Sequence, residues 1–186
     1  MACRKAGGHA LRIGMKSTLY KKAWKYLENI TPLEYDCGAL CGSACCKGSD
    51  QDGMLLFPGE EIMYIEDRNG ISIVDSHIGL SDGTRIKLLV CQGCCDRKKR
   101  PLSCRIFPII PQIDEHGCLT FTPDLRAAAL CPLLYRADLY TISPAFIDAL
   151  YSAFETLAED ERVTEFIGIL TRQNREIAAD LKRFYR

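Results

Sequence analysis

The stretch DCGALCGSACCKG, residues 36–48, contains four closely spaced cysteines, Cys37, Cys41, Cys45 and Cys46. Glycines separate these cysteines, and a glycine lets the backbone turn back so that several sulfurs can converge on one point. The amide N–H groups of such turns can donate to thiolates. Because soft metal ions prefer thiolate ligands, this stretch predicts a metal site around which the neighbouring chain folds.

A second group of cysteines lies in CQGCCDRKKRPLSCRIFP, residues 91–108. Cys91 and Cys94 have the two-residue spacing of a zinc knuckle, and Cys95 follows at once, so that Cys94 and Cys95 are alternatives for one ligand position. We expect Cys3 and Cys118 to be structural instead, because a cysteine is also a common core residue. The candidate ligands are Cys37, Cys41, Cys45, Cys46, Cys91, Cys94, Cys95, Cys104 and Cys131.

Eleven cysteines among 186 residues are the one unusual feature of the composition. Hydrophobic residues make up 47% and charged residues 26%, which excludes disordered and low-complexity classes. Lys plus Arg and Asp plus Glu are both 24, so no net field attracts nucleic acid or a membrane surface. We therefore expect neither as a partner, and leave a protein partner open.

The N-terminal residues carry scattered basic side chains where a secretory signal would need an apolar run. No segment approaches the roughly 18 apolar residues of a membrane span. These features favour a cytoplasmic location, where thiols stay reduced and clustered cysteines more often bind metal than form disulfides.

The pattern along the chain predicts one α+β domain over residues 1–186. A helix is expected near the N-terminus, with Ser17 as its N-cap and an apolar face that includes Leu19, Ala23 and Trp24. Residues 36–132 form a cysteine-cluster core rich in turns. The expected strands are 54–57, 71–74, 85–90 and 118–121, and a short helix is expected over 58–65.

Residues 143–186 are helical in pattern. Ser143 and Pro144 suit an N-cap and a first helical position. Three apolar stripes follow, beginning at Phe146, Val163 and Ile177, and we expect all three to pack in the core. The middle zone has few such stripes, so we expect bound metal to stabilise residues 36–132 and not the C-terminal helices.

The two cysteine groups together resemble a known family. The spacing of Cys37, Cys41, Cys45 and Cys46, a following Glu60-Glu61-Ile62, then Cys91, Cys94, Arg100-Pro101 and Cys104-Arg105-x-Phe107-Pro108 is similar to the YkgJ-type cysteine-cluster proteins. The resemblance covers roughly residues 36–132 and implies a small zinc- or iron-chelating domain. Similar cysteine patterns occur in a flagellin lysine methylase. The chain departs from the pattern at Cys95 and at Asp96-Arg97-Lys98-Lys99, which replaces apolar residues.

Thiolate ligands alone do not distinguish Zn²⁺ from an iron–sulfur cluster, because both are bound by four cysteines. Three functions therefore remain open. The first is a metal-binding protein whose cysteine cluster organises the fold, its role otherwise unknown. The others are an iron–sulfur redox or accessory protein for a modifying enzyme, and a zinc-dependent enzyme or zinc-finger-like interaction module. The sequence assigns no catalytic residue, and we lean against an enzyme.

One string resembles a catalytic motif. Residues 79–83, GLSDG, match the G-x-S-x-G pattern of serine hydrolases, which requires a strand before it and a helix after it. A strand-like pattern follows instead, so the string predicts a hairpin turn.

Overall fold

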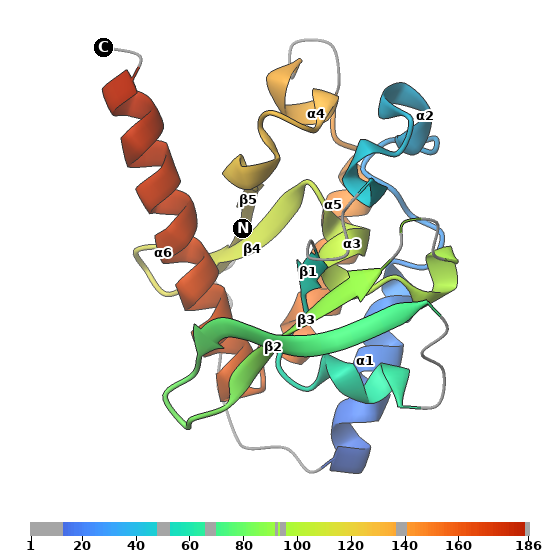
Figure 1. Cartoon of the computed structure of the whole chain (residues 1–186), viewed down its shortest axis with the longest axis vertical. Helices are drawn as coiled ribbons and strands as arrows, with labels where there is room; N and C mark the ends of the chain where they lie inside the picture. Colours follow the sequence, from blue (N-terminus) through green and yellow to red (C-terminus); the bar gives the residue numbers. More distant parts are fainter. Residues whose placement is uncertain are drawn as a thin grey trace.

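The structure, a computed structural model, describes residues 13–47, 53–65, 70–91, 93, 96–136 and 141–184. Helices lie toward both ends of the chain and antiparallel strands lie between them (Figure 1), which confirms the α+β class. The α-helices are α1 (Ile13–Tyr26), α2 (Gly38–Cys41), α3 (Leu102–Ile106), α4 (Pro132–Tyr135), α5 (Pro144–Leu157) and α6 (Glu161–Phe184). The 3-10 helices are η1 (Ala44–Cys46), η2 (Glu60–Tyr64), η3 (Arg97–Lys99) and η4 (Leu125–Ala127).

The strands form two antiparallel sheets. Strand β3 (Arg85–Cys91) pairs with β1 (Gly53–Leu55) on one side and with β2 (Ile71–Gly79) on the other. Strands β4 (Ile109–Ile113) and β5 (Leu119–Pro123) form a separate hairpin. Each of the four expected strands overlaps an observed one. Strand β4 was not predicted, because it contains Pro111, and a proline is tolerated in a strand chiefly at a sheet edge.

The G-x-S-x-G string is the hairpin turn between β2 and β3. The backbone N–H of Leu80 donates to the carbonyl of Thr84 at 2.9 Å, and Gly83 adopts a φ of 83°. Ser81 donates both its backbone N–H and its hydroxyl to the carboxylate of Glu165 on α6, at 2.7 and 2.8 Å. The serine therefore anchors the turn to α6.

The main hydrophobic core is shared by the helices and the middle of the chain. The ring of Phe57, which precedes η2, lies edge-on to Phe154 of α5 and Phe166 of α6, with centroids 5.0 and 5.4 Å apart. Ile86 of β3 and Leu102 of α3 are buried in the same cluster. The middle zone therefore builds its core jointly with the C-terminal helices.

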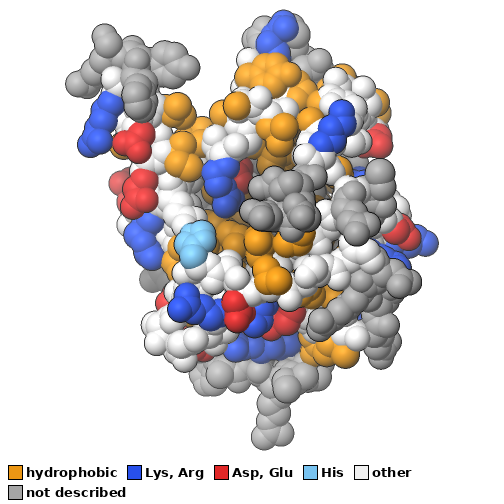
Figure 2. All heavy atoms as spheres, viewed as in Figure 1, with side chains coloured by type: hydrophobic (Ala, Val, Ile, Leu, Met, Phe, Trp, Pro, Cys, Tyr) orange, Lys and Arg blue, Asp and Glu red, His pale blue; other side chains and the backbone are white. Residues whose placement is uncertain are grey.

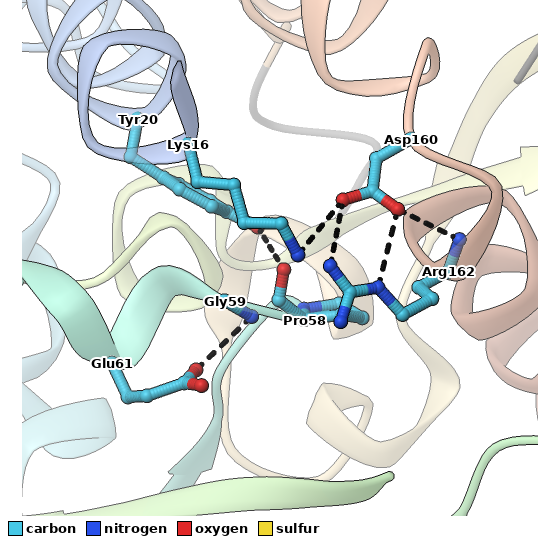
Figure 3. Close-up of polar contacts among 7 residues, drawn as sticks. All are labelled: Lys16, Tyr20, Pro58, Gly59, Glu61, Asp160 and Arg162. Atoms are coloured by element: carbon cyan, nitrogen blue, oxygen red, sulfur yellow. Dashed lines mark hydrogen bonds and ion pairs between the residues drawn. The ribbon is translucent and has the colours of Figure 1, made fainter. Parts of the chain in front are cut away.

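A polar network fastens α1 to this core (Figure 3). The ammonium of Lys16 lies 3.2 Å from the carboxylate of Asp160, which also accepts the backbone N–H of Arg162 at 3.0 Å. The hydroxyl of Tyr20 donates to the carbonyl of Pro58 at 3.0 Å. Lys16 and Asp160 are both buried, so α1 is held against the turn between α5 and α6 and against the loop before η2.

Two expectations about helix ends require correction. Helix α1 begins at Ile13, so Ser17 lies inside the helix and is not its N-cap. Helix α5 begins at Pro144 as expected, but the side chain of Ser143 makes no capping hydrogen bond. Proline already has the φ of a first helical residue, which allows the helix to begin without that bond.

The second and third apolar stripes belong to one long helix, α6. Its first half contributes Val163, Phe166 and Leu170 to the core. Its second half extends beyond the rest of the molecule at the upper left of Figure 1, and Leu181 is 37% exposed there. The expectation that the third stripe packs in the core is wrong for Leu181. In the described part of the chain, every helix is too short or too polar to cross a bilayer.

Candidate metal centre

Six of the nine candidate ligands line one cavity of about 60 Å³. They come from three separate segments: the stretch from α2 to η1, helix α3, and the residue that precedes α4. In Figure 1, α2 and α4 lie in the upper part of the molecule and α3 lies below them. The six are thiols and not disulfides: Cys37, Cys41, Cys45, Cys46, Cys104 and Cys131.

Two left-handed residues fold the first stretch back on itself. Helix α2 ends at Gly42, with a φ of 59°, and Ser43 follows with a φ of 56°. The carboxylate of Asp36 accepts the backbone N–H of Gly38 at 3.0 Å and so supports the start of α2. The reversal brings η1, which carries Cys45 and Cys46, to the same cavity as Cys41 of α2 and Cys37 just before it. This is the turn that the glycine spacing predicts.

The other two cysteines of the cavity are held by short helices. The backbone N–H of Cys104 donates to the carbonyl of Pro101 at 3.0 Å, within the first turn of α3. Cys131 donates its backbone N–H to Ala127 at 2.8 Å. Its side chain is buried in a small apolar cluster that includes Leu33 and Leu133. The cavity wall at Cys131 is therefore apolar.

The remaining cysteines are placed differently. Cys91 ends β3, packs beside Leu56 and Ile71, and is not among the residues that line the cavity. Cys118 is disulfide-bonded and also lies away from the cavity lining, beside β5. The predictions for Cys3, Cys94 and Cys95 fall outside the described residues.

Gly93 nevertheless shows that the second cysteine loop passes close to η1. A Cβ atom on Gly93 would lie 2.8 Å from the carbonyl oxygen of Cys46. Gly93 also has a φ of 82°, in the left-handed region that favours glycine. The contact therefore requires the absence of a side chain.

Burial raises the pKa values of three of the cavity thiols, Cys37, Cys45 and Cys131, and neighbouring cysteines raise them further. The pKa of Cys37 is raised first by burial, then by Asp36 and by its neighbours Cys131 and Cys41. Burial and the adjacent Cys46 raise the pKa of Cys45 to about 12. Burial also raises the pKa of Cys131. Without a cation in the cavity, these thiols therefore hold their protons at neutral pH.

Positively charged side chains form another part of the cavity wall, which is lined by Arg97, Arg100 and Arg105. Arg97 donates to the carbonyls of Glu28 and Ile30 at 3.2 and 2.8 Å. The sequence also favours charge compensation as the role of this basic segment and of Arg105, which follows Cys104, because cations near a thiolate-bound metal offset its negative charge. These arginines line the cysteine cavity, where their guanidinium groups favour negatively charged sulfur.

Glu60 belongs to the Glu60-Glu61-Ile62 stretch of the family pattern, but its buried supporting role was not predicted from the sequence. Its side chain is fully buried, and its carboxylate accepts the Trp24 indole N–H at 2.8 Å and the backbone N–H of Leu102 at 2.7 Å. A third donor is the backbone N–H of Phe57 at 3.1 Å. Burial outweighs these bonds and raises the pKa of Glu60 to about 7. Because Glu60 accepts the backbone N–H of Leu102, it fixes the start of α3, the helix that carries Cys104.

The thiols surround the cavity without converging on one point. Within the described ranges, no group of three or more His, Cys, Asp and Glu side chains is close enough to hold a metal ion in the rotamers present. A cysteine sulfur moves between three staggered positions by rotation about χ1 alone. Rotation about χ1 therefore changes the distances between these sulfurs.

Comparison of the chain with family models, curated proteins and solved structures finds no match. The geometry of the cavity therefore carries the functional inference.

Proposed function

We propose that the chain is a metal-binding protein whose cysteine cavity holds zinc or an iron–sulfur cluster through thiolate ligands. The observation that carries this proposal is the meeting of six cysteines, from three separate segments of the chain, around one cavity. Cysteine scattered through a hydrophobic core would not gather in this way. The resemblance to YkgJ-type cysteine-cluster proteins supports the same chemistry.

The size and the donors of the cavity favour an inorganic occupant. Its volume of about 60 Å³ lies far below the roughly 300–1,000 Å³ typical of pockets for organic ligands. Structural zinc and the common iron–sulfur clusters each take four cysteine ligands. Six cysteines exceed that number, so the cavity can supply one cluster with spare thiols or two ions with shared ligands.

We propose no reaction at this cavity. The metal then organises the fold, transfers electrons as an accessory cluster, or shapes a surface for a protein partner. We propose a cytoplasmic location, because six free thiols around one cavity suit a reducing compartment, although Cys118 is disulfide-bonded.

The test is the metal content of single variants purified without oxygen. Cys41→Ser, Cys45→Ser, Cys104→Ser and Cys131→Ser should each lower the bound zinc or iron, because each removes a thiolate from the cavity. In protein whose Cys118 disulfide has been reduced, Cys118→Ser, which alters a residue outside the cavity lining, should keep the wild-type content. Elemental analysis measures both metals, and visible absorption distinguishes a coloured iron–sulfur protein from a colourless zinc protein.

Two results would overturn the proposal. Near-absence of zinc and iron in reduced wild-type protein from metal-replete cells would remove the metal-binding function. Equal metal loss in the cavity variants and in Cys118→Ser would show that the six cavity cysteines are not a distinct ligand set.

A further inference from the structure

We propose that Arg105 is a positioning residue of the cysteine site: its guanidinium donates a hydrogen bond to a metal-bound thiolate and offsets part of the negative charge of the complex. This inference rests on the proposed metal-binding function and names a residue that strengthens metal binding.

The guanidinium of Arg105 is held in place along one edge and on one face. Its Nε donates to the carbonyl of Arg100 and its Nη2 donates to the carbonyl of Lys98, both at 2.7 Å. Its central carbon lies 4.7 Å from the centroid of the Trp24 ring, in a cation–π contact. Arg105 is only 4% exposed. Its orientation is therefore set by the protein before any metal binds.

One donor of this fixed group remains unused. Nη1 is buried, and no hydrogen-bond acceptor within the described ranges reaches it. Leaving a buried donor unsatisfied is unfavourable, and more so for a charged group. Arg105 lines the cysteine cavity and follows Cys104 directly in α3. A thiolate in that cavity is the acceptor that would satisfy Nη1.

The positive charge of Arg105 is not neutralised by an ion pair in the described segments, so it can act on the cysteine site. None of the ion pairs within the described segments involves Arg105. Glu60, the acid with the strongest electrostatic effect on Arg105, already accepts three N–H donors from Trp24, Leu102 and Phe57. A metal ion with four thiolates carries net negative charge, so a buried cation beside it stabilises the complex. Arg105 lines the cysteine cavity, so its charge lies beside the proposed site.

Cobalt(II) is the probe that tests this role, because thiolate-bound cobalt absorbs through charge transfer from sulfur to metal. A hydrogen bond lowers the energy of the sulfur lone pair, so its loss moves the absorption to longer wavelength. The full-length reduced chain is freed of metal and titrated with cobalt(II). Wild type is compared with Arg105→Gln, Arg105→Lys and the control Ile106→Val. Ile106 is the next residue of α3, buried at 1% exposure, and does not line the cysteine cavity.

Arg105→Gln should bind cobalt about 10–100-fold more weakly, the usual effect of losing an outer-sphere partner, and its absorption should move to longer wavelength. Arg105→Lys retains the charge but loses the planar fork, so its affinity should fall less while its absorption still moves. Ile106→Val changes packing alone and should leave the absorption at the wild-type wavelength.

A wild-type absorption and affinity in Arg105→Lys, or in a folded Arg105→Gln, would overturn the role of Arg105 while leaving metal binding intact. An equal shift of the absorption in Ile106→Val would also overturn it, because packing would then explain the effect. A wild-type chain that binds no cobalt would instead count against the proposed function itself.

Discussion

At the scale of single residues, Glu60 links the helices around the site through one buried carboxyl group. It joins Trp24 of α1 to Leu102 of α3, and Trp24 in turn stacks on Arg105. Sequence alone could not single it out from Glu61, because both acids suit the first turn of a helix. Only the tertiary structure shows that Glu60 turns inward and is fully buried.

Glu60 predicts a dependence of stability on pH. Its pKa is raised from an ordinary 4.5 to about 7, so between these values the folded state binds more protons than the unfolded state. The free energy of unfolding should therefore fall as pH rises through this window, by about 3 kcal/mol from this group. Urea titrations across the window measure the slope.

The matched variants for this prediction are Glu60→Gln and Glu61→Gln. Glu60→Gln removes the titrating group and should flatten the slope, whereas Glu61→Gln leaves Glu60 in place and should retain it. An unchanged slope in Glu60→Gln would assign the pH dependence to another group.

The cavity thiols predict a second dependence on pH. The raised pKa values of Cys37, Cys45 and Cys131 mean that metal must displace protons as it binds. Metal affinity should therefore increase with pH, and protons should be released on binding. Competition with a chelator of known affinity, at pH values from about 6 to about 8, measures the trend. Affinity independent of pH would show that protonated thiols are not the groups that metal displaces.

At the scale of elements, the contact between the second cysteine loop and η1 provides a test with a matched control. Gly93 and Gly83 have φ values of 82° and 83°, so an alanine at either position carries similar backbone strain, about 1–2 kcal/mol. At Gly93 the new Cβ would also meet the carbonyl of Cys46 at 2.8 Å, whereas at Gly83 nothing lies within 4 Å.

Gly93→Ala should therefore lose bound metal as well as stability, because it pushes the loop away from η1. Gly83→Ala should lose stability alone. Thermal unfolding and elemental analysis of both variants separate the two effects. Equal metal content in the two variants would show that the contact with Cys46 does not shape the site.

The elements show which parts of the fold are readable from sequence. The N-terminal helix, α5, and the positions of β1, β2, β3 and β5 follow from local pattern, since alternation and helical spacing are properties of neighbouring residues. Strand β4 escaped prediction because Pro111 argues against a strand, and only its pairing with β5 at a sheet edge permits it. Helix α6 is longer than its apolar stripes suggested, because nothing between them ends the helix.

The candidate site could be predicted from the sequence to a similar extent. The turn at Gly42 follows from local chemistry, and so does the clustering of Cys37, Cys41, Cys45 and Cys46. The placement of Cys91 in a separate apolar cluster depends on the register of β3, which spacing along the chain does not reveal. The position of Arg97 and Arg100 in the cavity lining likewise depends on where η3 packs. Whether the cavity thiols are metal ligands stays a prediction.

At the scale of the whole molecule, the distribution of hydrophobic side chains indicates where metal matters for stability. Middle-zone residues such as Ile86 and Ile109 belong to the large core that they share with α5 and α6. The cavity cysteine Cys131 packs instead in a small cluster with Leu33 and Leu133. On the face shown in Figure 2, hydrophobic side chains also lie in the hollow between the upper end of α6 and the neighbouring part of the molecule.

Because most of the middle zone belongs to the large core, metal removal should affect only the part of residues 36–132 around the cavity and the residues next to it. Chelation under reducing conditions should expose residues 31–47 and 125–136, which surround the cavity and have few apolar partners. Strands β3 and β4 and helix α5 should keep their protection, because the large core holds them. Hydrogen exchange measured peptide by peptide reports both. Loss of protection across all of residues 36–132 would instead show that the whole middle zone depends on metal.

The central claim, that the cavity cysteines hold a metal ion as thiolates, is tested most directly by X-ray absorption at the edge of the bound metal. The account predicts a first coordination shell of sulfur, at about 2.3 Å if the metal is zinc. Cys41→Ser or Cys104→Ser should lose this shell together with the metal. A first shell of nitrogen and oxygen at about 2.0–2.2 Å, or an unchanged sulfur shell in both variants, would contradict it.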